Sequence, residues 1–179
     1  MNTDRKLLLR IYLLFIPVAY VSYLFHEFGH WIVGEVLGNN MMFSLNYVWP
    51  KNGHYIDASH EVLVLIGGPA FTILLAVISL LIIEKYSTIY AYPLVIFQMV
   101  LRFFSLIFSG FYKQDEARIS SLLGLGTYTV GIIVLIVLFL IVLRASYKLK
   151  IDFQYNSYFF TVSILCLLMV IATYKLTGL

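Results

Sequence analysis

Three stretches of this chain run for more than 20 residues without a charged side chain. They cover residues 62–83, 119–143 and 153–174. A helix rises about 1.5 Å per residue, so ~20 apolar residues cross the ~30 Å hydrocarbon core of a bilayer. Inside a bilayer the backbone has no water to bond, and a helix satisfies its polar groups internally. These stretches therefore predict transmembrane helices.

Two further stretches are apolar apart from isolated ionisable groups. Arg102 is the only charged residue in 86–112, and the apolar run from residue 11 continues across two histidines and two glutamates to Leu37. The chain is 61% hydrophobic and 12% charged, with a mean hydropathy of +0.92, outside the range of soluble domains. We expect an all-α polytopic membrane protein with one membrane-embedded domain, 1–179. Its helices are predicted at about 11–37, 62–83, 87–110, 118–143 and 154–175.

The loop at 39–58 connects the first two predicted helices. Apolar and polar residues alternate over 41–49, and Pro50-Lys51-Asn52-Gly53 is a turn signal. The pattern predicts a small β-hairpin. Beside a catalytic site, its open edge would pair with an extended peptide. Its Trp and Tyr residues would equally suit an anchor at the membrane surface.

The first predicted helix carries His26-Glu27-Phe28-Gly29-His30. Residues four apart share a helix face, so both imidazoles can bind one tetrahedral cation while Glu27 acts on a water. Neighbouring carbonyls or water would be the ordinary partners of a histidine pair. Two histidines and a carboxylate are costly to hold in a membrane without a metal or other partners. The motif predicts zinc-dependent hydrolysis within, or at the edge of, a bilayer.

A catalytic zinc takes three protein ligands and keeps one open position. The motif lies near the end of its helix, so the third ligand must come from segments on the same membrane face. Asp115, at the start of the fourth predicted helix, meets this condition, and it would also suit a helix cap. Other candidates on that face are Glu116, Glu61, His60, Asp57 and His54.

Three further polar residues are candidates for an oxyanion-stabilising or supporting role. Arg102 lies at a depth similar to His30. It could orient Glu27, stabilise an oxyanion or pair with Asp115 or Glu116; structural pairing or extension to the interface is the alternative. Thr72 would donate to an oxyanion or bond its own helix. Glu116 is the nearest competitor of Asp115.

The motif, the hairpin-like loop, Gly67-Gly68-Pro69 in the next helix and the later acidic residue together resemble the site-2 protease family of intramembrane zinc metalloproteases. The resemblance covers roughly residues 20–126. It implies one zinc ion per chain bound by His26, His30 and Asp115, with Glu27 as general base. The implied substrate is a membrane protein or a membrane-associated peptide.

The chain departs from that family at two positions. Thr72 stands where the family commonly has Asn after Gly-Pro, and Asp115 is followed by Glu116 where the family commonly has Gly. Two alternatives follow. The protein would be a non-proteolytic metal-binding or metal-transporting protein, or a protease of the prenyl-protein-processing type with Glu116 or Glu61 as third ligand.

The basic residues bear on partners and orientation. They form no run with interleaved aromatics, so we expect no nucleic-acid partner. The predicted helices lead us to expect a multi-pass protein of the cell membrane, surrounded by lipid. With the amino terminus inside, seven Lys and Arg are cytoplasmic against four outside, which favours that orientation. It places the metal near the outer face, whereas the family resemblance implies a site nearer the cytosol.

Overall fold

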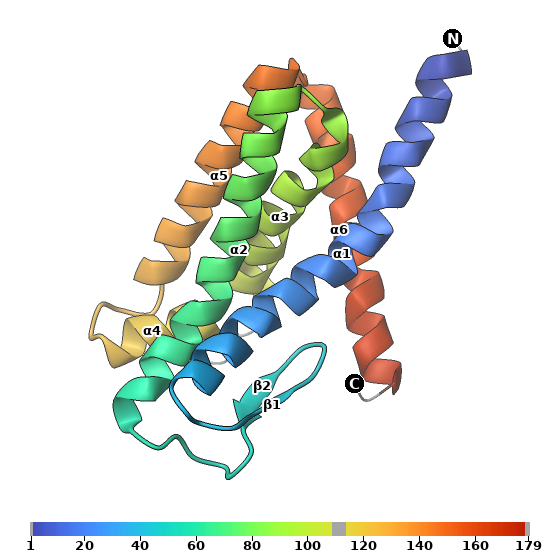
Figure 1. Ribbon diagram of the computed structural model, residues 1–179. Helices are drawn as coiled ribbons and strands as arrows, with labels where there is room; N and C mark the ends of the chain where they lie inside the picture. Colours follow the sequence, from blue (N-terminus) through green and yellow to red (C-terminus); the bar gives the residue numbers. More distant parts are fainter. Residues whose placement is uncertain (1, 109–113, 178–179) are drawn as a thin grey trace.

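A computed structural model describes residues 2–108 and 114–177 of the chain (Figure 1). The described residues form six α-helices, one short 3-10 helix and a two-stranded antiparallel sheet. Five helical segments are long and apolar enough to cross a membrane, as in a multi-pass membrane protein. The predicted all-α architecture, with five spans and a β-hairpin between the first two, is confirmed.

The first two long helices cover almost all of the first two predicted spans. Helix α1 (Asn2–Val36) runs through Pro17 and ends at a turn in which Gly38 has a φ of +80°. Helix α2 (Ala58–Tyr86) continues through Pro69 and ends at Ser87, which adopts a left-handed conformation. The expected end of the first helix at Leu37 therefore differs from the observed end by one residue.

The 3-10 helix η1 (Ile89–Ala91) leads into α3 (Tyr92–Phe108), and residues 109–110 of the predicted third span lie outside the described residues. The prediction of a fourth span at 118–143 was wrong at both ends. A separate helix, α4 (Asp115–Leu122), precedes the span, which is α5 (Thr129–Leu149). Gly124 and Gly126 have φ values of +68° and +80°, which interrupt the helix. Helix α6 (Phe153–Thr177) encloses the fifth predicted span.

The hairpin consists of β1 (Met41–Phe43) and β2 (Val48–Pro50), with Met42 opposite Trp49. Its turn lies at residues 44–47, where the N–H of Ser44 donates to the carbonyl of Tyr47 over 3.0 Å. The turn signal at 50–53 is therefore not the hairpin turn but follows β2. Met41 and Val48 pack on Val64 of α2, which fixes the hairpin against the helices.

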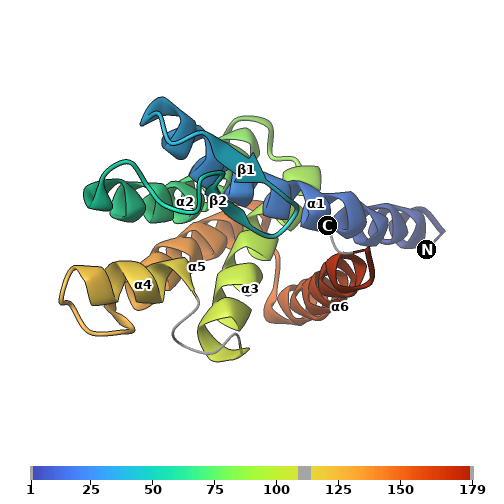
Figure 2. The same cartoon turned by 90° about the horizontal axis from the view of Figure 1, so that it is seen from below.

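The core lies between α1, α2, α3, α5 and α6. Its largest fully buried side chains include Phe15, Phe97, Phe159 and Leu138, which come from four different helices. Figure 2 shows α3 between α5 and α6, and α6 packs on α1 and α3. Large apolar side chains on the outer faces of α5 and α6 are exposed, as expected of surfaces that contact lipid.

One end of the bundle gathers the elements that carry the motif. The end of α1, the hairpin, the start of α2 and the short helix α4 all lie at the lower end of the molecule in Figure 1. The candidate residues from distant parts of the sequence therefore meet at this end.

Candidate metal centre

The two motif histidines face each other on adjacent turns of α1. His26 and His30 are both buried, and their Nε2 atoms lie 3.2 Å apart. The rings are nearly perpendicular, with an interplanar angle of 88°. This is the geometry expected of two residues four apart on one helix face.

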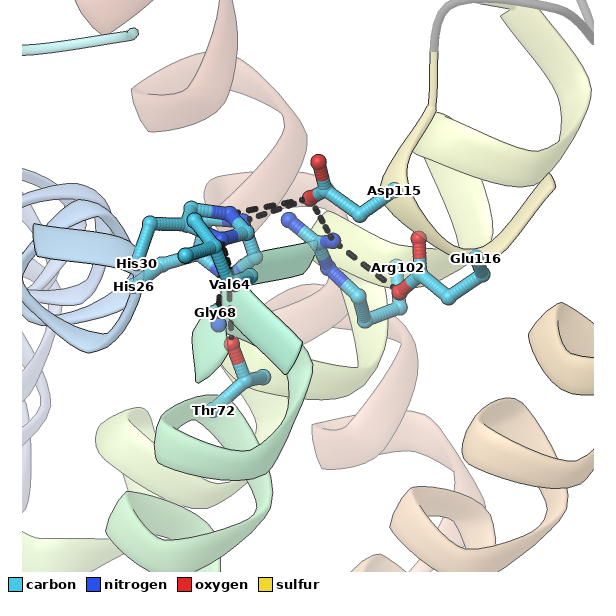
Figure 3. A network of polar contacts seen from close by, with 8 residues as sticks. All are labelled: His26, His30, Val64, Gly68, Thr72, Arg102, Asp115 and Glu116. Carbon is cyan, nitrogen blue, oxygen red and sulfur yellow. Dashed lines mark hydrogen bonds and ion pairs between the residues drawn. The ribbon is translucent and has the colours of Figure 1, made fainter. Parts of the chain in front are cut away.

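Asp115, the first residue of α4, completes the cluster. Its Oδ2 lies 3.0 Å from Nε2 of His26 and 3.2 Å from Nε2 of His30 (Figure 3). The residue in the N-cap position of α4 is Gln114, so Asp115 does not cap the helix. Burial raises the pKa of Asp115, but His30 and the hydrogen bonds from both histidines outweigh it and hold this pKa well below its usual range.

The donor set fits a small tetrahedral cation. The three ligand-type atoms form a triangle with edges of 3.0, 3.2 and 3.2 Å. Ligands about 2.0–2.1 Å from a tetrahedral zinc ion stand about 3.3 Å apart, close to these values. Among the described residues, His26, His30 and Asp115 form the one group of His, Cys, Asp or Glu side chains with metal-site spacing.

Helix α2 orients both imidazoles from behind. Nδ1 of His30 lies 2.7 Å from the carbonyl oxygen of Val64, and the backbone N–H of Gly68 lies 3.3 Å from the same nitrogen. A carbonyl only accepts, so the shorter contact makes Nδ1 the donor, and a His30 that bound a cation would be neutral and would present the lone pair of Nε2 to it. Nδ1 of His26 lies 3.0 Å from Oγ1 of Thr72. Partners on the second ring nitrogen are typical of metal-binding histidines.

Two glycines of α2 make this approach possible. A methyl group at Gly67 would overlap the carbonyl of Gly29 on α1, and one at Gly68 would overlap the rings of His26 and His30. Small residues let membrane helices approach closely. The Gly67-Gly68 pair therefore brings α2 up to the motif and makes room for the imidazoles.

The remaining predicted side chains have defined places. Glu27 is buried and lines the cavity described below. Nη1 of Arg102 lies 3.1 Å from Oε1 of Glu116 and 4.0 Å from Oδ2 of Asp115. Thr72 contacts the ring of His26 and does not line that cavity, so its observed contact is with a candidate ligand and not with the space open to a substrate.

The other candidates for third ligand lie apart from the histidine pair. Glu61 pairs with Arg118 of α4. Asp57 caps α2, and hydrogen bonds from the hydroxyl and N–H of Ser59 lower its pKa. His60 contacts Asn39, and His54 lines the cavity.

A cavity of about 1260 Å³ opens beside the cluster. Strand β2 forms one wall, and α3 and the last third of α6 form another. Sequence reasoning missed the α6 residues, because no local pattern shows which helix covers the motif. Those residues are Leu167, Leu168, Ile171, Tyr174 and Lys175.

No protein-family model, no curated protein and no solved structure matches this chain. The residues of the site and their geometry are therefore the basis for proposing a function.

Proposed function

We propose that this protein is an intramembrane zinc metalloprotease of the site-2 protease type. The observation that carries the proposal is the meeting of His26, His30 and Asp115, within 3.2 Å of one another, beside the buried Glu27. Two residues come from a membrane-length helix and the third from a helix 85 residues or more away. A surface ion pair would not require such an arrangement.

Each residue has a separate role in peptide hydrolysis. His26, His30 and Asp115 would hold one zinc ion, whose contribution when bound is Lewis-acid activation of a water and of the substrate carbonyl. Glu27 would accept a proton from the attacking water and return it to the leaving amine. The C–N bond breaks, and water supplies the OH of the new acid and one H of the new amine.

The cavity supports a peptide substrate. Its volume of about 1260 Å³ exceeds the ~300–1,000 Å³ typical of small-molecule sites. Val48, Trp49 and Pro50 of β2 line it, as do apolar side chains of α6. A segment of a membrane protein must leave its helical hydrogen bonding before it can be cut, and a strand edge offers replacement partners. The setting would be the cell membrane.

Replacement of Glu27 tests the proposal. Purified Glu27→Gln should bind zinc as the wild type does and should lose cleavage of a reporter containing an apolar span. Glu35→Gln is the matched control, because Glu35 lies on the same helix, outside the cavity lining, and its carboxylate accepts from the N–H of Met41. Undiminished cleavage by Glu27→Gln would overturn the proposal. If metal flux needs the histidines but not Glu27, the protein is a metal transporter.

A further inference from the structure

We infer that Arg102 selects which of two adjacent carboxylates reaches the cation, and so keeps the fourth coordination position open. Asp115 and Glu116 are consecutive at the start of α4, and either side chain is a chemically suitable ligand. Arg102 comes from α3 and lies against both. The inference rests on the proposed metal site.

The contacts of Arg102 are unequal. Its Nη1 is 3.1 Å from Glu116, within hydrogen-bonding distance, but 4.0 Å from the oxygen of Asp115 that faces the histidines. Figure 3 shows the guanidinium group between the histidine pair and Glu116. The arginine therefore binds Glu116 directly and leaves Oδ2 of Asp115 directed at His26 and His30.

Burial makes this choice consequential. Arg102 is 8% exposed and Glu116 is 4% exposed. Oε2 of Glu116 and Nε of Arg102 are buried without a hydrogen-bond partner among the described residues. A buried carboxylate that lost its cationic partner Arg102 would be strongly drawn to another cation, and one is proposed beside the adjacent Asp115.

A second carboxylate would change the kind of site. Three protein ligands leave a position for water and substrate, whereas four protein ligands make a closed structural site. Arg102 is thus a positioning residue. It holds Glu116 out of the coordination sphere, and the cation keeps a vacant position for chemistry.

A double-mutant cycle on metal affinity tests the selection. Co²⁺ is titrated into the full-length protein in detergent, and its visible absorption reports coordination number. In the wild-type background, Asp115→Asn should weaken Co²⁺ binding by about 100-fold or more. In the Arg102→Gln background, the same substitution should cause a loss of affinity at least about tenfold smaller, because Glu116 replaces the lost ligand. The same penalty in both backgrounds would overturn the inference.

A second pair of variants tests the same inference without leaving the Glu116 carboxylate buried and unpaired. Glu116→Gln should weaken Co²⁺ binding about tenfold, because Arg102 then turns to Asp115, and Arg102→Gln/Glu116→Gln should restore it to within about threefold of the wild type. A double variant no better than Glu116→Gln would overturn the inference. Arg144→Gln is the control, because it breaks an arginine–glutamate pair between α5 and α2 outside the cavity.

The two levels of the proposal fail differently. A wild-type protein that binds no metal overturns the metal site itself, and this inference with it. A wild type that binds metal while the Asp115→Asn penalty is independent of Arg102 overturns the inference alone.

Discussion

Gly29 of α1 and Gly67 of α2 lie so close that a methyl group on either would overlap the backbone carbonyl of the other. The two helices touch backbone to backbone at this point, three residues after His26 and one before His30. The next glycine, Gly68, faces the imidazoles directly. The approach of α1 to α2 and the placement of the histidines are therefore set by the same contact.

Gly67→Ala should destabilise the fold. The added methyl meets backbone atoms, which cannot move as a side chain does, so we expect a loss of about 1–3 kcal/mol in the free energy of unfolding. Unfolding in detergent measures it. Gly131→Ala is the control, because a methyl there would meet only side-chain atoms of Leu106 and Glu116. Equal stability of Gly67→Ala and the wild type would contradict the packing described.

Gly68→Ala should impair the site more than the fold. Its methyl would overlap the rings of both histidines, so we expect zinc affinity to fall by about tenfold or more while helical content is kept. Competition with a chromophoric chelator measures the affinity, with Gly131→Ala again as control. Unaltered zinc binding by Gly68→Ala would show that the imidazoles lie elsewhere.

Thr72→Val removes one partner of His26 while keeping side-chain shape. Because Oγ1 of Thr72 lies 3.0 Å from Nδ1 of His26, its loss should lower zinc affinity by about 10–100-fold. Thr161→Val is the matched control: that exposed hydroxyl bonds the carbonyl of Ser157 in its own helix. If both variants bind zinc equally well, Thr72 does not orient His26.

Leu168→Trp tests the cavity as the substrate site. Leu168 of α6 lines the cavity, and a larger ring there should obstruct a peptide without touching the metal ligands. We expect cleavage of a span-containing reporter to fall at least about tenfold, with zinc content unchanged. Leu165→Trp, on an exposed part of α6 outside the cavity, should cleave normally. Normal cleavage by Leu168→Trp would place the substrate elsewhere.

The sequence allowed the helical architecture to be predicted because each span depends on local composition. The five spans and the hairpin were recognised, and the motif placed His26 and His30 on one helix face. The start of the fourth span was mispredicted because the charge-free run from residue 119 conceals the break at Gly124 and Gly126. Apolarity alone does not distinguish a turn from a helix.

Tertiary contacts were only partly accessible from the sequence. Topology limited the third ligand to one membrane face, and the structure brings Asp115 to the histidines; its role as a ligand stays a prediction. The pairing of Arg102 with Glu116 was one of several options, because a lone membrane arginine does not reveal its partner. The sequence gives no indication that α6 lines the cavity, because a helix that is apolar on all sides does not show which face packs against the rest of the protein.

The zinc content of the purified protein tests the central claim most directly. Measured by mass spectrometry after dialysis, the wild type and Glu61→Gln should each hold about one zinc ion per chain, and Asp115→Asn should lose most of it. Glu61 is the informative comparison, because it lines the same cavity but pairs with Arg118. Absence of zinc from the wild type, or zinc retained by Asp115→Asn and lost from Glu61→Gln, would contradict a centre built from His26, His30 and Asp115.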